Sequence, residues 1–221
     1  MSAAGGKTLR DRAALAATIA PLGGLTEESM RQATRRAERR AAGLIRKGGV
    51  SGRGSGGLDL VAGEGLTAVS EAIGVYQRGG RVTGHDRIAW LGVALTDLRV
   101  RDDAWARMLP GQVQAHLRLW TDVVRHVPAR YVPAPASLLA FTAWQAGNGA
   151  LANVAAQRAL AADPGYSMAL LLLEAIGAGM PPSAARLPMT PEEVAASYAR
   201  AGACPPRGPR ASGRASGPTP P

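Results

Sequence analysis

The chain has 221 residues, of which 46% are hydrophobic and only 4% aromatic, and its formal net charge is +10. No unbroken apolar run is long enough to span a membrane. Thr8 and Asp11 interrupt the stretch that a signal peptide would need, and the single cysteine, Cys204, excludes a disulfide framework. Abundant alanine with few β-branched runs favours helix over sheet. We therefore expect a cytoplasmic, all-α protein with disordered termini.

The positive charge is confined to the two ends of the sequence. Residues 1–57 carry eleven basic and four acidic side chains, residues 58–203 carry twelve of each, and residues 204–221 carry three arginines and no acid. Arginine outnumbers lysine by 24 to 2, which indicates GC-rich codon usage and weakens any functional reading of arginine abundance. Charge and composition together predict four regions: a basic N-terminal helical arm (1–47), a Gly/Ser-rich linker (48–57), a neutral helical body (58–203) and a disordered Pro/Arg/Gly tail (204–221).

The first predicted element is a helix over residues 10–46 with a break at 20–24. Thr26 followed by two glutamates is typical of a helix start. A thin apolar stripe then recurs at spacings of three and four, at Met30, Ala33, Ala37, Ala41 and Leu44. The opposite face is basic and carries Arg31, Arg35, Arg36, Arg39, Arg40, Arg46 and Lys47. Two interpretations stay open: a solvated surface, as charge runs usually are, or a contact with phosphate or an anionic membrane surface.

A Gly-rich stretch, 48–57, follows this helix. It lacks the Gly-x4-Gly-Lys-Ser/Thr spacing of a phosphate-binding loop, and no predicted strand precedes it. A flexible linker between the arm and the body is therefore the prediction.

Apolar periodicity divides the body into further helices, and the nearest approach to a strand is the short piece 80–83. Asp86 is a plausible cap, and the acidic pair Asp102–Asp103 can begin a helix. Prolines at 128, 133 and 135 predict a break. The predicted helices run from 58 to a stop at Gly79–Gly80, from 86 to 98, from 102 to 108, and over 111–127, 138–146, 150–162, 167–177 and 191–201.

One helix pair, 133–166, has a recognisable internal pattern. Gly147 stands where the first helix must stop, because glycine accepts a positive φ there. Ala152 and Ala159 place small side chains on one side of the second helix, so that two helices can cross closely, and Asp163–Pro164 ends it. The pattern is similar to a tetratricopeptide repeat. Only one clear copy is present, which predicts a helix pair within a helical body and not an extended solenoid.

Residues with catalytic or metal-binding chemistry are few and scattered. None of the three histidines, His85, His116 and His126, has the i, i+4 partner of a helical zinc site. Cys204 lies in the Pro-rich tail without a base, and no oxygen-rich loop surrounds Asp102–Asp103. We therefore predict no catalytic residue, no metal and no cofactor, and hence a non-enzymatic protein.

Several runs of the sequence carry a family resemblance: Asp11–Leu15, Asp86–Leu91, Asp97–Asp102, His116–Trp120, Ala134–Pro135, 140–164, Gly165–Ala169 and Gly179–Ser183. Together they resemble the C-terminal, tetratricopeptide-like part of the actinobacterial domain of unknown function family numbered 4192. The resemblance spans residues 10–186 and implies a helical fold, with no established activity and no catalytic residues. Members usually begin with a further α/β segment that is missing here, so the resemblance implies a shortened member or a misplaced gene start.

The leading functional prediction is a scaffold that binds an unknown protein partner through the surface of its helix pairs. The predicted contacts lie on or beside the second helix of the pair: Trp144, Asn148, Asn153, Gln157 and Arg158. The alternative is a nucleic-acid-associated protein whose arm, 31–47, binds phosphates through Arg35, Arg36, Arg39 and Arg40. Salt-sensitive binding distinguishes the alternative from the scaffold.

Overall fold

The computed structural model describes residues 12–50, 56–185 and 189–203, and every regular element within these ranges is helical. This confirms the all-α prediction, and the piece 80–83 is irregular and not a strand. A helical segment over 12–18 comes first. The α-helices that follow are α2 (Leu25–Val50), α3 (Gly56–Gln77), α4 (His85–Ala94), α5 (Leu98–Ala106), α6 (Val113–His126), α7 (Pro133–Gln145), α8 (Gly149–Ala162), α9 (Ser167–Gly177) and α10 (Pro191–Ala203). Three short 3-10 helices connect them: η1 (Pro110–Gln112), η2 (Ala129–Tyr131) and η3 (Pro182–Ala185).

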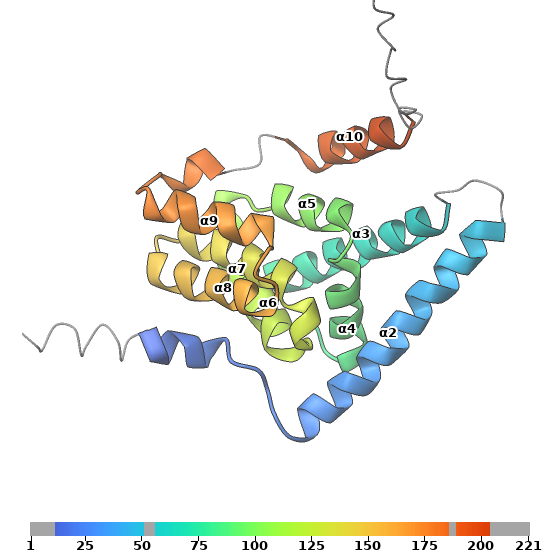
Figure 1. Cartoon of the computed structure of the whole chain (residues 1–221), viewed down its shortest axis with the longest axis horizontal. Helices are drawn as coiled ribbons and strands as arrows, with labels where there is room; N and C mark the ends of the chain where they lie inside the picture. Colours follow the sequence, from blue (N-terminus) through green and yellow to red (C-terminus); the bar gives the residue numbers. More distant parts are fainter. Residues whose placement is uncertain (1–11, 51–55, 186–188, 204–221) are drawn as a thin grey trace, which may run out of the picture.

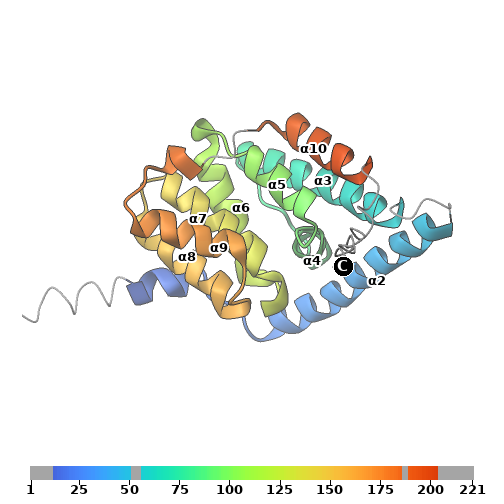
Figure 2. The same ribbon diagram turned by 45° about the horizontal axis from the view of Figure 1, so that its top comes forward.

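The helices form two packed groups joined by α6 (Figure 1). In one group α7 packs against α8 and α9, and in the other α2 packs across α3 and α4 while α10 lies on α5 (Figure 2). Helix α6 contacts α3 and α4 on one side and α7 on the other. From Pro133 to Trp144 every residue of α7 is buried, as expected for a helix that is apolar on all sides. Helix α7 is therefore the centre of its group.

The pair α7–α8 follows the predicted pattern closely. Helix α7 ends at Gln145, and Gly147 adopts a φ of +76° in the turn. The side chain of Asn148 caps α8 by accepting a hydrogen bond from the Leu151 amide at 3.0 Å. Ala152 and Ala159 are fully buried, so small side chains do let the two helices approach each other. These details confirm the helix pair, whereas its likeness to a tetratricopeptide repeat stays a prediction.

The basic N-terminal helix is packed against the body. The predicted apolar stripe of α2 is its inner face: Met30, Ala33 and Ala37 are buried, and Ala41 and Leu44 pack against the same core. Helix α2 runs on to Val50, and α3 begins at Gly56, so much of the predicted linker 48–57 is helical. A Cβ atom on Gly57 would lie 2.4 Å from the carbonyl oxygen of Ile45. Glycine at 57 thus allows the backbones of α2 and α3 to touch.

Three predicted details of helix starts are wrong. Helix α4 is preceded by Gly84 at a φ of 90°, and Asp86 lies in its first turn without capping it. Helix α5 begins after Asp97, whose side chain accepts a hydrogen bond from the Arg99 amide, so the acidic pair 102–103 lies inside the helix. Helix α7 begins at Pro133 and not at 138, because proline is well suited to the first turn, where no amide is needed.

Cys204 and the predicted disordered tail, 204–221, lie outside the described residues, as does the start of the N-terminal arm. Within the described part of the chain, no helix is long and apolar enough to cross a membrane.

Candidate functional site

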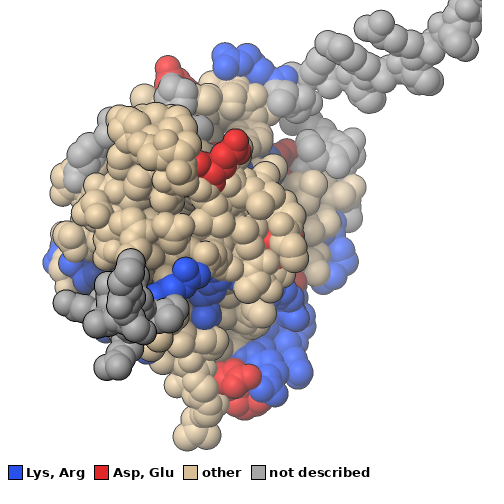
Figure 3. All heavy atoms as spheres, turned by 60° about the vertical axis from the view of Figure 1, so that its left-hand side comes forward, with Lys and Arg blue, Asp and Glu red and all other residues tan. Residues whose placement is uncertain are grey.

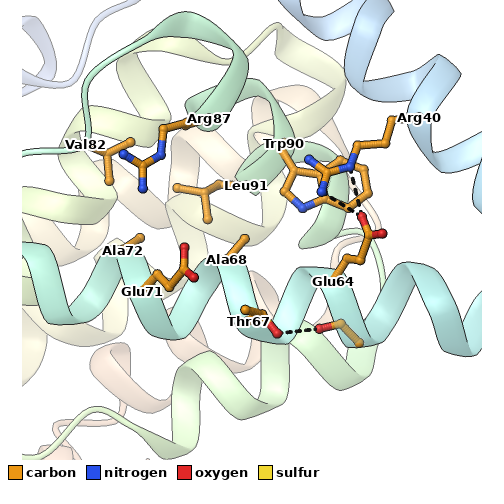
Figure 4. A pocket seen from close by; sticks show the side chains of 11 residues that line it. Arg40, Glu64, Thr67, Ala68, Glu71, Ala72, Val82, Arg87, Trp90 and Leu91 are labelled. Carbon is orange, nitrogen blue, oxygen red and sulfur yellow. Dashed lines mark hydrogen bonds and ion pairs between the residues drawn. The ribbon is translucent and has the colours of Figure 1, made fainter.

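A groove lies between α2, α3 and α4 and encloses about 360 Å³ (Figure 4). Its floor is apolar and is formed by Ala68, Ala72, Val82 and Leu91. Charged side chains stand around this floor, among them Arg40 from α2, Glu64 and Glu71 from α3, and Arg87 from α4. We call this feature the α2–α4 groove.

One end of the α2–α4 groove is closed by an interaction of three side chains. The guanidinium of Arg40 lies over the ring of Trp90, 4.3 Å from its centroid, and forms an ion pair with Glu64 at 2.8 Å (Figure 4). The indole Nε1 atom of Trp90 is buried and has no hydrogen-bond partner among the described residues. A stacked and paired Arg40 holds α2 against α3 and α4, so its first role is structural.

The other end of the groove carries a carboxylate and a guanidinium on opposite walls. Glu71 reaches from α3 and Arg87 from α4 toward the hollow between them (Figure 4). Neither side chain forms an ion pair within the described part of the chain. Thr67, a hydroxyl side chain that also lines the groove, donates a hydrogen bond to the carbonyl oxygen of Gly63 at 3.0 Å, within its own helix.

The five predicted partner contacts on the helix pair do not form one exposed surface. Trp144 is buried, and Asn148, which is exposed, is engaged as the cap of α8. Asn153 is half-buried and donates to the carbonyl of Gly149 at 2.9 Å, within its own helix. Gln157 is exposed and accepts a hydrogen bond from Arg12, while Arg158 is half-buried. Most of these side chains therefore serve the packing and capping of the pair itself.

The four predicted phosphate-binding arginines are all exposed on α2, but they fall into two kinds. Arg36 forms an ion pair with Asp86 at 2.7 Å, and Arg40 with Glu64. Arg35 and Arg39 form no ion pair with a described residue and point away from the buried face of the helix, four residues apart. Of the four, only Arg35 and Arg39 form no direct ion pair, although the charge of Arg35 also acts on Glu38.

The sequence reasoning missed an apolar surface on α9. Leu170 is 47% exposed and Leu171 is 64% exposed, and both lie one turn before Glu174 on the outer side of the helix. Across residues 133–177 only Arg158, Asp163 and Glu174 are charged, and this side of the molecule is largely uncharged in the space-filling view (Figure 3). The signal was present in the run of four leucines at 170–173, because one helix face cannot bury all four. We call Leu170, Leu171 and Glu174 the α9 face.

Two buried titratable side chains, His116 and Tyr76, have shifted pKa values. His116 is 1% exposed and lies beside Trp120, and burial lowers the pKa of its imidazole to about 4. Burial and the neighbouring carboxylate of Asp122 raise the pKa of Tyr76 to about 12, in a cluster that Arg81 completes. No group of three or more His, Cys, Asp or Glu side chains among the described residues is placed to hold a metal ion.

Comparison with known proteins gives a family but no function. The family model described as "Domain of unknown function (DUF4192)" matches residues 1–183. No curated protein and no solved structure matches the chain. The matched stretch includes the α2–α4 groove and the α9 face, and α10 lies beyond it. On this match over most of its length, the chain belongs to the DUF4192 family of domains of unknown function.

Proposed function

We propose that this protein is a non-enzymatic scaffold that binds a partner protein through the α9 face. The observation that supports the proposal is the exposure of Leu170 and Leu171 on a helix with a single charged residue, Glu174. Apolar side chains grouped on an otherwise folded surface are typical of protein–protein contacts. A cytoplasmic location, which the single cysteine favours, belongs to the same proposal.

The position of α9 at the outside of its group supports the same conclusion. Helices α7, α8 and α9 pack on one another: α7 is buried on all sides, and α8 and α9 each bury one side. In arrays of stacked helices the outermost helix usually presents a polar face to water. Helix α9 instead buries Met168 and Leu172 and leaves two leucines exposed. The outer side of α9 is therefore apolar, as is typical of a helix face that packs against another helix.

The occupant that fits best is an amphipathic helix of another protein with a basic residue beside its apolar stripe. Apolar side chains of such a helix would cover Leu170 and Leu171, as the apolar faces of α8 and α9 cover each other. Glu174 lies one turn from these leucines and forms no ion pair with a described residue. A lysine or arginine on the partner would neutralise it, and this charge complementarity fixes the register of the two helices.

The test places a photo-crosslinking amino acid at position 171 of the full chain in host cells. The matched control carries it at Leu98, an exposed leucine of α5 that is 51% exposed. The expected result is a discrete crosslinked protein from position 171 but not from position 98. The crosslinked segment of that protein, made as a peptide, should be an apolar and basic helix. It should bind the purified chain, and Leu171→Asp should weaken that binding at least about tenfold.

Two results would overturn the proposal. One is the same set of crosslinked proteins from positions 171 and 98, which would mark both as ordinary surface. The other is a peptide that binds Leu171→Asp as tightly as the wild type. A crosslink between two copies of the chain at position 171 would show that the α9 face binds a second copy of the chain and not a helix of another protein.

A second candidate is nucleic-acid binding through α2, which Arg35 and Arg39 favour because both are exposed and form no direct ion pair with a described residue. It is tested by binding to a DNA duplex of about 20 base pairs and to a single-stranded RNA at increasing salt concentrations. On this hypothesis, changing both residues to Gln makes the slope of log K against log salt shallower, by the amount that corresponds to two lost phosphate contacts. The paired Arg36 and Arg40, changed together, serve as the control and have a smaller effect. Failure to bind at about 50 mM salt would exclude this function.

A further inference from the structure

A second cavity lies where the C-terminal ends of α6 and α8 meet the segment before α2, and it encloses about 440 Å³. Its walls include the apolar side chains of Leu22, Met30 and Val132. Three arginines also line it: Arg31 of α2, which pairs with glutamates of its own helix, Arg125 of α6 and Arg158 of α8. We call it the two-arginine pocket, after Arg125 and Arg158. It shares no residue with the α9 face or the α2–α4 groove, so a ligand bound there is independent of the proposed scaffold function.

Arg158 is half-buried in the two-arginine pocket with few partners. One terminal nitrogen donates to the carbonyl oxygen of Val124 at 3.3 Å, and the Nε atom is buried without any partner among the described residues. No carboxylate of the described chain forms an ion pair with it. Burial lowers the pKa of this guanidinium, which nonetheless remains charged in proteins. The fold thus holds a partly desolvated positive charge without a counter-charge.

Arg125 adds a second unneutralised charge to the same pocket. It lies in the last turn of α6, and its Nε atom is also buried without a partner in the described structure. Glu27 is the acidic residue that lines the pocket, and its carboxylate contacts Arg31 at 3.6 Å. The pocket therefore contains two positive charges beyond those that its own acid can neutralise.

The attraction of a helix C-terminus for cations explains part of this arrangement. The last carbonyls of α6 favour positive charge nearby, and the bond from Arg158 to Val124 is such a contact. A guanidinium has five N–H donors, however, and this contact uses one donor of one arginine. Two guanidinium groups on the wall of one cavity are instead the usual arrangement for holding an oxyanion.

We propose that the two-arginine pocket binds a small molecule with a carboxylate or phosphate group attached to an apolar body. The oxyanion accepts hydrogen bonds from Arg125 and Arg158, and the apolar body lies against Leu22, Met30 and Val132. The pocket volume is in the range of small-molecule sites. Both guanidinium groups come from regular helices, α6 and α8, so the site is largely formed before the ligand arrives.

The test uses isothermal titration of the full chain with phenyl phosphate and, separately, with benzoate, at constant ionic strength. Benzyl alcohol is the uncharged control probe. We expect saturable one-to-one binding of at least one anion and none of the alcohol, and the stronger of the two anions identifies the class of ligand. Arg125→Gln should weaken binding about tenfold, because a hydrogen bond to a charged group is worth about 1.5–3 kcal/mol. Arg87→Gln, at a residue that lines the α2–α4 groove and not this pocket, should leave it unchanged.

Arg158→Gln should weaken binding similarly, but it also removes the contact with Val124. Its folding is therefore checked first by circular dichroism, and Arg125→Gln, which loses no hydrogen bond that its side chain makes in the described structure, carries the test if Arg158→Gln fails to fold. Binding that is not saturable, or that Arg125→Gln leaves intact, would overturn the proposal.

Discussion

The buried imidazole of His116 makes the stability of this protein depend on pH. The side chain is 1% exposed and lies beside Trp120 in the core. Burial favours the neutral form and lowers the pKa to about 4 from the usual 6.5. Between these two values the unfolded chain binds a proton that the folded chain does not. The free energy of unfolding therefore falls as the pH drops from 6.5 to 4 and levels off below.

The size of the effect follows from the two pKa values. A shift of one pKa unit corresponds to about 1.4 kcal/mol. Between about pH 7 and pH 4.5 the unfolded state gains nearly all of its proton and the folded state little, so His116 alone should lower the free energy of unfolding by about 2 kcal/mol. That is a large fraction of the stability of a typical domain.

The assay is urea unfolding at about pH 7, 6, 5.5, 5 and 4.5, with the free energy extrapolated to zero urea at each pH. His116→Leu removes the titrating group and should flatten the profile by about 2 kcal/mol over this range. His85→Gln is the matched control, because His85 is exposed where His116 is buried. Equal pH profiles for the wild type and His116→Leu, or an NMR titration of His116 near its usual value of about 6.5, would refute the reasoning.

Two further predictions concern packing and a buried ionic cluster. Asp122 is buried and accepts hydrogen bonds from the Tyr76 hydroxyl and from Nε of Arg81, the latter at 2.9 Å. Asp122→Ala should lower the free energy of unfolding, measured by urea unfolding, by about 2 kcal/mol. An unchanged free energy of unfolding would show that this cluster does not stabilise the fold. A Cβ on Gly92 would lie 2.7 Å from Cγ1 of Val127, whereas one on Gly63 meets nothing within 4 Å. Gly92→Ala should therefore lower the free energy of unfolding by about 1–3 kcal/mol, and Gly63→Ala should raise it by about 0.5–1 kcal/mol. Both are measured as shifts of the melting temperature, and shifts of the same sign would show that the space around each glycine does not decide the outcome.

The features that the sequence predicted well are those set by neighbouring residues. The apolar stripe of α2 and the buried Ala152 and Ala159 follow from helical periodicity, which local sequence determines. The turn at Gly147 follows from the positive φ that glycine accepts. Helix starts were predicted less well. Helix α4 follows Gly84, whereas a cap at Asp86 was expected, and α7 begins at Pro133, where a proline break was expected.

The features that the sequence could not provide depend on contacts between distant segments. Arg36 and Arg40 resemble Arg35 and Arg39 along the helix, and only the positions of Asp86 and Glu64 on other helices separate the paired arginines from the unpaired ones. The periodicity of α9 likewise shows that it is apolar, but not which of its leucines remains uncovered. The pocket around Arg158 brings together several segments that are distant in the chain and was not visible in the sequence pattern.

The most direct test of the scaffold proposal compares three baits in one affinity capture from a host lysate, at low and moderate salt and with nuclease treatment. The baits are the wild type, Leu171→Asp and the double variant Arg35→Gln with Arg39→Gln. A scaffold that works through the α9 face predicts one discrete protein that survives salt and nuclease, binds the arginine variant and is lost from Leu171→Asp. Recovery of nucleic acid alone, lost with salt and absent from the arginine variant, would contradict it and assign the function to α2.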